Sequence, residues 1–197
     1  MKDKTAAKGE LSSERVLEVA ARLFREKGYL ATSVREIGKA ADMKAGSLYY
    51  HYPSKESLLE AVVTEAITSL TNEVRIALEK ASGAPFRDRL RVAVEAHLRS
   101  IHEHGDFAIT SREAMDMLPP ESRKRHLALR TEYGNIWQAL FEEAKARGEV
   151  RADLDIVPVQ MLILGAINWT SEWLDPKRRS LQRASGILTD LVLDGMT

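Results

Sequence analysis

The 197-residue sequence predicts an all-α fold, and two observations carry this prediction. Apolar residues recur at three- and four-residue steps through almost every segment, whereas the period-two alternation of half-buried strands is hard to find. Helix caps, glycines and prolines also divide the chain into segments of helical length. With 44% apolar and 29% charged residues, the chain is long and ordered enough for one or two domains with a buried core.

The first helix is expected over about residues 13–27. Its apolar stripe begins at Val16, and Ser12 or Ser13 can cap its N-terminal end. Gly28 follows where a left-handed C-terminal cap belongs.

Two short helices should follow. Ser33 and Glu36 have the spacing of a capping box, which predicts a helix over about 34–41. Another helix is expected over about 45–52, because Pro53 ends it. Two short helices joined by a tight turn form a helix-turn-helix candidate.

The rest of the chain predicts longer helices. Caps and breakers place them at about 55–81, 86–103, from Gly105 to Met117, from Pro120 to Gly148, 156–174 and 180–194. Ser54 and Asp155 are the expected N-terminal caps, and Ser180 is expected to start the last helix. The helix over 156–174 is apolar nearly all round, so more than one neighbour must cover it.

The net charge of zero hides an asymmetry between the two ends of the chain. Residues 1–55 hold 11 lysines and arginines against 7 acidic residues, a net charge of +4. Residues 56–197 therefore carry −4. This balance excludes a uniformly basic coat, but a basic head on an acidic body indicates an anionic partner for the head.

Several function classes are not expected. No P-loop, dinucleotide-binding or hydrolase motif is present, and no histidine has a glutamate three residues before it, as di-iron enzymes need. The absence of cysteine removes thiolate metal sites, and His97, His102 and His104 do not share one helix face. We therefore expect no enzyme, metal or cofactor. The first residues lack the apolar core of a secretory signal, which favours a cytoplasmic location with no membrane partner.

The most informative window is residues 33–59, which contains G-S-L-Y-Y-H-Y-P-S-K-E. This window resembles the DNA-binding region of the TetR family of bacterial transcriptional regulators, and the resemblance covers about residues 12–63. The polar residues 1–11 are expected to form a mobile tail. The resemblance implies a DNA-binding domain over 12–58, and a ligand-binding and dimerisation domain over 59–197. It further implies a homodimer joined by the last two helices, a palindromic DNA operator, and a small-molecule effector that releases a repressor.

The resemblance and the residue chemistry together give a set of DNA contacts. The start of the second short helix is free to enter a major groove, and Lys55 in the next helix's first turn can clamp a phosphate. Arg35 reaches a guanine edge in the family's usage. The full set is Ser33, Arg35, Lys44, Ala45, Gly46, Ser47, Tyr49, Tyr50, His51 and Lys55.

Two residues depart from the family pattern. Asp42 stands where the turn usually has glycine, although aspartate tolerates a left-handed backbone. Lys44 stands where serine or threonine commonly caps the recognition helix, so it adds charge and removes a cap.

Candidate effector contacts are the aromatic, methionine and polar residues of the body. They are His97, Phe107, Met115, Met117, Arg130, Tyr133, Trp137, Asn168, Trp169 and Trp173. Aromatic residues at helical spacing also serve as ordinary core, and that alternative stays open. The pair of tryptophans one turn apart resembles members that respond to acyl-CoA thioesters or other hydrophobic metabolites.

Two further alternatives remain at this point. Gly165 and Gly186 lie inside the last two helices and indicate close packing, either at a subunit interface or within one subunit. A helical adaptor that binds another protein through Trp169 and Trp173, without DNA, is the rival function, although the basic head argues against it.

Overall fold

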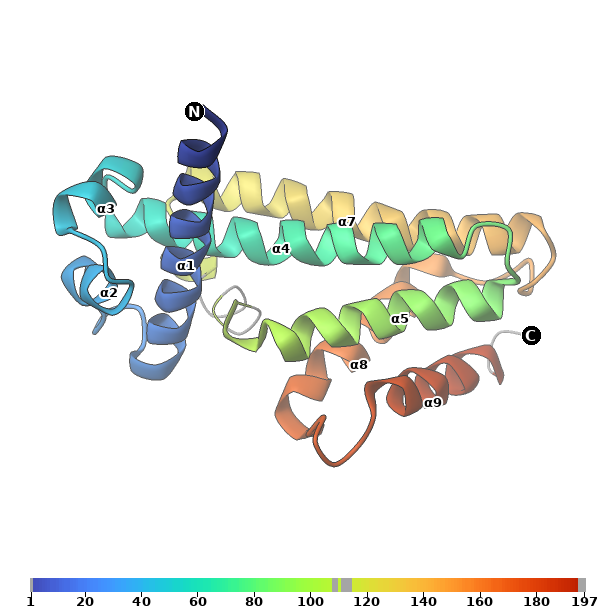
Figure 1. Cartoon of the computed structure of the whole chain (residues 1–197). Coiled ribbons are helices and arrows are strands. Elements are labelled where there is room, and N and C mark those ends of the chain that lie inside the picture. The colour runs from blue at the N-terminus through green and yellow to red at the C-terminus, as the bar shows by residue number, and fades with distance from the viewer. Residues whose placement is uncertain (1, 108–109, 111–114, 195–197) are drawn as a thin grey trace. The chain divides into compact units, whose positions relative to one another are not determined.

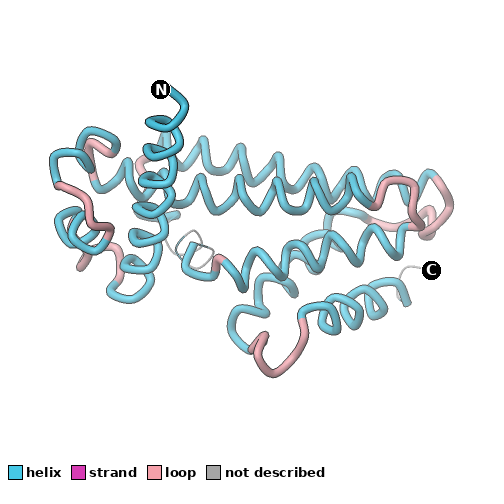
Figure 2. Tube along the Cα trace, viewed as in Figure 1, coloured by secondary structure: helices cyan, strands magenta, loops and turns pink. Residues whose placement is uncertain are grey.

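The computed structural model of the chain describes residues 2–107, 110 and 115–194. Every regular element in these ranges is a helix, as Figure 2 shows, which confirms the all-α prediction. The elements are α1 (Lys2–Lys27), α2 (Val34–Ala40), α3 (Ala45–His51), α4 (Lys55–Lys80), α5 (Phe86–Glu103), η1 (Met115–Met117), α7 (Pro120–Ala146), α8 (Ile156–Trp173) and α9 (Leu181–Asp194) (Figure 1).

The chain forms two compact units. The first unit comprises Met1–Ala66 and Asp106–Ala128, and the second comprises Ile67–Gly105 and Leu129–Thr197. Each unit has its own cluster of buried apolar residues. The boundary expected between residues 58 and 59 separates the DNA-binding domain from the ligand-binding domain. It is defined by function and not by compactness, and it stays a prediction.

In the core of the first unit, one apolar stripe of α1 packs against the short helices α2 and α3. Val16, Ala20 and Phe24 lie one turn apart on α1 and are buried with Ile37 of α2 and Leu48 of α3. A helix as short as α3 is not stable alone, so its position depends on this packing. Leu48 is fully buried and provides the contact.

Helix α1 differs from the prediction at its N-terminal end. It begins at Lys2 and not at about residue 13, so neither Ser12 nor Ser13 is its cap. The hydroxyl of Ser13 instead lies 2.9 Å from that of Tyr52, at the end of α3. The expected C-terminal end is confirmed, because Gly28 has a φ of 83°.

The core of the second unit lies among the C-terminal part of α4 and helices α5, α7, α8 and α9. Trp137, Phe141 and Phe86 are its largest fully buried side chains. Helices α7 and α8 approach closely where the Gln160 amide donates a 3.0 Å hydrogen bond to the carbonyl of Gly134. A Cβ at position 134 would lie 3.2 Å from that amide nitrogen, so glycine permits this approach.

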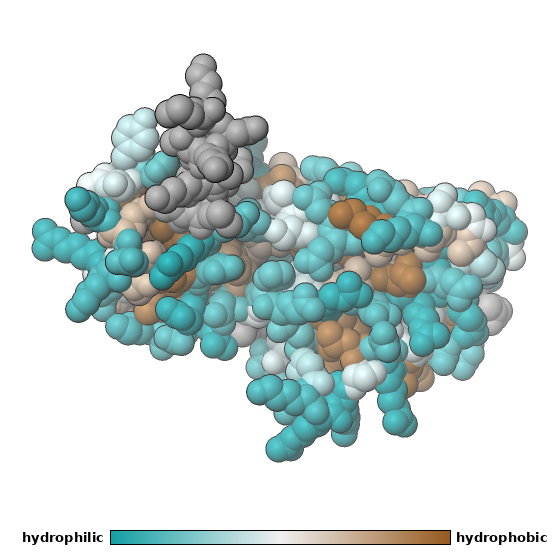
Figure 3. All heavy atoms as spheres, viewed as in Figure 1, coloured by the Kyte–Doolittle hydropathy of each residue, from teal (hydrophilic) through white to brown (hydrophobic). Residues whose placement is uncertain are grey.

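Helix α8 is covered on one side only within the described chain. Ile163 and Ile167 face the core, while the opposite side is exposed. We call this surface, with its continuation on α9, the α8–α9 apolar face; it comprises Val157, Met161, Leu162, Trp169, Trp173, Ile187 and Leu191. The view in Figure 3 shows a mainly hydrophilic surface with apolar side chains between.

The ends of the later helices agree with the predictions except at one cap and between Gly105 and Met117. Residues 108, 109 and 111–114 of the helix expected there lie outside the described residues, and Met115–Met117 form the 3-10 helix η1. Ser54 accepts a hydrogen bond from the backbone N–H group three residues on, as expected, and Ser180 does the same just before α9. Asp155 precedes α8 but makes no side-chain cap bond, so that prediction is wrong. Among the described residues, no helix has the length and apolar character required to cross a bilayer.

Candidate nucleic-acid interface

The start of α2 is fixed by the predicted capping box. The Ser33 hydroxyl accepts from the Glu36 N–H at 3.2 Å, and the Glu36 carboxylate accepts from the Ser33 N–H at 2.9 Å. Hydrogen bonds from the Ser33 backbone, then from the side chains of Lys27 and Ser33, lower the pKa of Glu36 to about 2. Because Glu36 is charged at neutral pH, the cap holds α2 with Arg35 exposed in its first turn.

The turn between α2 and α3 depends on two residues. Asp42 adopts a φ of 55°, the only positive value outside glycine among the described residues, and so fills the glycine role as expected. The Met43 N–H then donates to the Gly38 carbonyl at 2.8 Å. A Cβ at Gly38 would lie 3.3 Å from the Met43 carbonyl oxygen and 3.5 Å from Leu48, so glycine lets α3 pack tightly on α2.

The N-terminal end of α3 is open. Lys44 precedes the helix in an extended conformation and makes no side-chain cap bond, as its departure from the family pattern predicts. Gly46 and Ser47 are exposed, and among the described residues no atom beyond the neighbours and helix backbone of Gly46 lies within 4 Å of a Cβ built on it. Ala45 begins the helix, and its side chain lies outside the described residues. The first-turn N–H groups of α3 are therefore available to a partner.

The tyrosines of α3 divide between partner and core. Tyr50 is 84% exposed and Tyr49 46%, whereas Tyr52 is half-buried against Ser13. His51 is exposed and lies edge-on to the Tyr50 ring at 5.4 Å between centroids. Hydrogen-bond donors at the end of an exposed helix suit phosphate contacts, which fix position without reading sequence.

Lys55 is held by residues that sequence reasoning missed. Its ammonium lies 4.2 Å from the centre of the Tyr29 ring and donates to the Leu30 carbonyl at 3.3 Å. The Tyr29 hydroxyl in turn donates to Glu56 at 3.4 Å. Burial, then the Glu56 charge, raises the pKa of Tyr29 to about 12, so the hydroxyl stays a donor. No local sequence pattern marks this contact, because Tyr29 and Lys55 are far apart in the sequence.

The predicted effector residues fall into separate places. His97, Tyr133 and Trp137 are buried together in the second unit, with Nδ1 of His97 2.8 Å from the Tyr133 hydroxyl. Phe107 and Met115 pack in the core of the first unit. Met117 belongs to the same unit, but its side chain is exposed.

The remaining effector candidates are on the surface of the second unit. Arg130 and Asn168 are exposed. Trp169 and Trp173, at 63% and 53% exposure, point away from the core because Ile167 and Thr170 take the buried side of α8. The expected tryptophan wall of a pocket is therefore not formed by the described chain alone.

The buried cluster of His97, Tyr133 and Trp137 contains polar atoms with few partners. Burial lowers the pKa of His97 to about 4, against an opposing hydrogen bond from Asn168. Burial likewise raises the pKa of Tyr133. Within the described residues, the buried indole Nε1 of Trp137 makes no hydrogen bond of normal geometry. The cluster can therefore offer a donor to a ligand that opens this core.

His97 makes stability depend on pH. Because its folded pKa lies below the ordinary value of 6.5, the unfolded chain binds the proton first as the solution is acidified. Stability from neutral His97 is complete above pH 6.5 and is lost as the pH falls toward 4, by on the order of 3 kcal/mol. Urea unfolding at several pH values should show this slope, and His97→Leu should flatten it. An unchanged slope in the variant would show that other groups cause the acid sensitivity.

The histidines do not gather around a metal. His102 lies 3.2 Å from the Thr170 hydroxyl, and His104 lies 3.8 Å from Glu73. Within the described residues, no group of three or more histidine and acidic side chains is placed to hold a metal ion.

Comparisons with known proteins agree with this geometry. Residues 16–62 match the family described as bacterial regulatory proteins, tetR family, and residues 83–196 match the tetracyclin repressor-like C-terminal domain. The HTH-type transcriptional repressor KstR2 of Rhodococcus jostii is 32% identical over 155 residues, which cover 78% of this chain and 74% of that relative.

Two solved structures extend the likeness to the whole fold. The TetR family transcriptional regulator PfmR of Thermus thermophilus superimposes with a TM-score of 0.82 at 31% identity, over 91% of this chain and 97% of that one. The ketosteroid transcriptional regulator KstR2 of Mycobacterium tuberculosis gives 0.79 at 25% identity, over 94% of each chain. None of these comparisons supports the adaptor alternative.

Proposed function

The chain belongs to the TetR family of bacterial regulatory proteins and is a DNA-binding transcriptional repressor, and we propose how it acts. It binds a short palindromic operator as a homodimer in the cytoplasm, without catalysing a reaction. A hydrophobic or acyl-CoA-like metabolite then releases it from the operator. The observation that carries the proposal is α3, which is anchored by the buried Leu48 while its N-terminal end is open.

The DNA contacts follow from the residues around α3. Gly46 and Ser47 meet base edges at the bottom of the major groove, where Gly46 lets the backbone approach closely. Tyr49, Tyr50 and His51 donate to phosphates beside the groove. Ser33, Arg35, Lys44, Ala45 and Lys55 complete the set, with Arg35 reading a base and Lys55 clamping a phosphate.

Lys55→Ala should weaken binding to every DNA sequence and lower the slope of log affinity against log salt by about 1, because one phosphate contact is lost. Arg35→Ala should instead change preference among bases. Fluorescence anisotropy with operator and scrambled duplexes at several salt concentrations separates the two. Arg151→Ala, an exposed arginine of the second unit, is the matched control. Unaltered salt dependence in Lys55→Ala would contradict the clamp.

The dimer is proposed to form through the α8–α9 apolar face. Large exposed apolar patches mark interaction sites, and this one lies on the last two helices. Among the described residues outside its own helix backbone, no atom lies within 4 Å of a Cβ built on Gly165, so packing within one subunit does not account for this glycine, which favours close approach by a second copy. Gly186 instead faces Arg91 of α5 in the same subunit, with the guanidinium 3.8 Å from a built Cβ.

The effector is proposed to enter the core of the second unit near His97, Tyr133 and Trp137. An apolar pocket with a few convergent polar groups is typical of small-molecule sites. The Trp137 Nε1, which makes no hydrogen bond of normal geometry within the described residues, and the neutral His97 are such groups. A relative of this fold is a ketosteroid regulator, which supports a large hydrophobic ligand. Phe107, Met115, Met117, Arg130, Asn168, Trp169 and Trp173 remain predicted contacts.

Release then follows from a population shift. An effector that prefers the conformation with lower operator affinity weakens DNA binding by its coupling free energy, typically 5- to 150-fold. The test is a thermal-shift screen with acyl-CoA thioesters and steroid acids, followed by operator anisotropy with each compound that stabilises the protein. If operator binding occurs but no hydrophobic compound lowers it, the effector class is wrong while the regulator assignment stands.

A further inference from the structure

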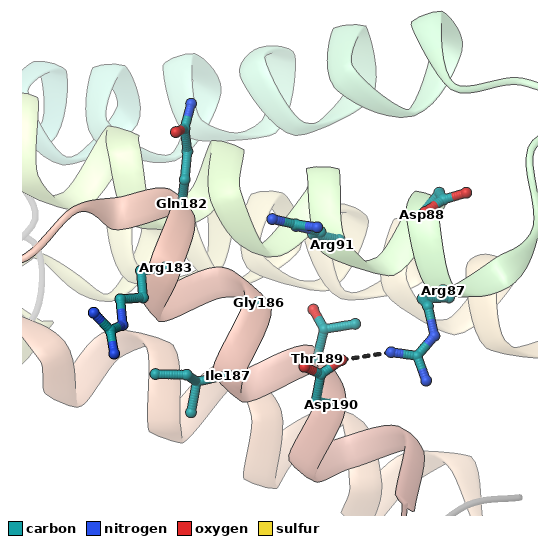
Figure 4. Close-up of a pocket in the computed structure, with 9 residues that line it drawn as sticks. All are labelled: Arg87, Asp88, Arg91, Gln182, Arg183, Gly186, Ile187, Thr189 and Asp190. Atoms are coloured by element: carbon teal, nitrogen blue, oxygen red, sulfur yellow. Dashed lines mark hydrogen bonds and ion pairs between the residues drawn. The ribbon is translucent and has the colours of Figure 1, made fainter.

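A groove lies between α5 and α9 in the second unit, apart from the buried aromatic cluster. It has a volume of about 290 Å³, near the lower end of the range for small-molecule sites. Figure 4 shows the residues that line it: Arg87, Asp88 and Arg91 from α5, and Gln182, Arg183, Gly186, Ile187, Thr189 and Asp190 from α9. Hydrogen-bonding side chains dominate this lining.

The cations of the groove are only partly neutralised. Arg87 forms an ion pair with Asp190 across the two helices (Figure 4). Within the part of the chain that the structure describes, neither Arg91 nor Arg183 forms an ion pair. The Arg91 guanidinium lies along Gly186, 3.8 Å from where a Cβ would be, so the missing side chain leaves the guanidinium accessible from α9.

A second observation, at Thr189, points to a ligand site at this place. Thr189 lines the groove and is 1% exposed, yet within the described residues its hydroxyl has no hydrogen-bond partner. A threonine inside a helix usually bonds the carbonyl one turn before it, and buried polar groups are nearly always paired. In Figure 4 the Thr189 side chain points from α9 toward α5, the side on which Arg91 and Arg87 lie.

We propose that the α5–α9 groove binds a phosphate-type oxyanion. Guanidinium groups recognise phosphate through paired, charge-assisted hydrogen bonds, and a hydroxyl donates a further bond to an oxyanion. Arg91 supplies the main contact, the Thr189 hydroxyl supplies the buried one, and Gln182 and Arg183 lie at the rim. The ligand is a phosphate or diphosphate group, either free or carried by a metabolite.

This proposal is independent of the hydrophobic effector. It uses no residue of the buried aromatic cluster, and its test needs neither DNA nor an acyl chain. If Arg91 were only solvated by water, the lack of a partner for the buried Thr189 hydroxyl would have no explanation. A bound oxyanion accounts for Arg91 and for Thr189.

The test is isothermal titration of inorganic pyrophosphate into the full-length protein at constant ionic strength, because charge interactions depend on salt. Arg91→Gln should weaken binding at least about 10-fold, the effect of losing a charged hydrogen bond. Thr189→Val keeps the shape of the side chain and should weaken binding about 3-fold or more. Arg179→Gln is the matched control, since Arg179 is exposed, forms no ion pair with described residues and lies outside the groove.

A second arm titrates coenzyme A, which carries phosphate and diphosphate groups but no acyl chain. Tighter binding than pyrophosphate would assign the anion to a larger phosphate ester, and equal binding would assign it to the bare diphosphate; both support the site. No binding of either, or equal losses in Arg91→Gln and Arg179→Gln, would overturn it. So would a changed oligomeric state in Arg91→Gln with pyrophosphate affinity unaltered, since the groove would then belong to the dimer interface. Operator binding by the same samples reports on the regulator function separately.

Discussion

Leu162→Glu is expected to convert the dimer into monomers and to lower operator affinity by about 100-fold or more, the lower range of what joining two binding modules contributes. Leu162 is 74% exposed on α8, so the substitution removes no packing from the described fold. In the dimer, however, it would place two unpaired carboxylates in an apolar interface, and burying unpaired charge is costly. A single head then contacts one half-site only.

Sedimentation velocity and operator anisotropy on the same samples measure both effects. The matched control is Ile76→Glu, which adds the same charge at a 49% exposed apolar position on α4, outside the α8–α9 apolar face. It should remain dimeric and bind the operator normally. A dimeric Leu162→Glu protein with full operator affinity would mean that the subunits meet through another surface.

Leu48→Ala is expected to lose about 2–5 kcal/mol of stability and most of the operator affinity. The Leu48 side chain is fully buried between α3 and α2. It packs so closely on Gly38 of α2 that a Cβ built on this glycine would lie 3.5 Å from it. Removing it leaves a cavity between α2 and α3, and a seven-residue helix has little stability of its own. Urea unfolding gives the stability loss, and operator anisotropy below the unfolding transition gives the binding loss.

Tyr50→Ala separates these two effects. Tyr50 is 84% exposed two residues further along the same helix, so its removal should leave the unfolding midpoint unchanged while it weakens DNA binding. If Leu48→Ala destabilises the protein but binds the operator as tightly as the unaltered chain, α3 does not present the DNA contacts.

The sequence predicted the helices well because their ends carry local signals. The Ser33–Glu36 capping box, Gly28 and Pro120 act within one helical turn, and each marks an end that the structure confirms. The start of α1 was missed because serines inside a helix resemble caps when only the sequence is read. Asp155 failed for a related reason, since a capping residue type at the right position need not form the bond.

The candidate interface was less predictable where it depends on contacts distant in sequence. Exposure of Tyr49 and Tyr50 follows from their spacing, because neighbours on a helix cannot all face the core. The cation–π contact between Lys55 and the Tyr29 ring joins residues 26 positions apart, and no local pattern encodes it. Trp169 and Trp173 stay predicted effector contacts, and their exposure in the single chain could not be predicted, because helical periodicity shows which residues share a face but not which face is covered.

The different surroundings of the three tryptophans have a spectroscopic consequence. Trp137 is enclosed in the second unit's core, whereas Trp169 and Trp173 are exposed on α8 in the single chain and would be covered in the proposed dimer. Indole emission moves to shorter wavelength when water is removed from the ring, so dilution that separates the subunits should shift the spectrum to the red. A Trp137→Phe protein would report that assembly without the core signal, and a protein that keeps only Trp137 would report occupation of the core by a ligand.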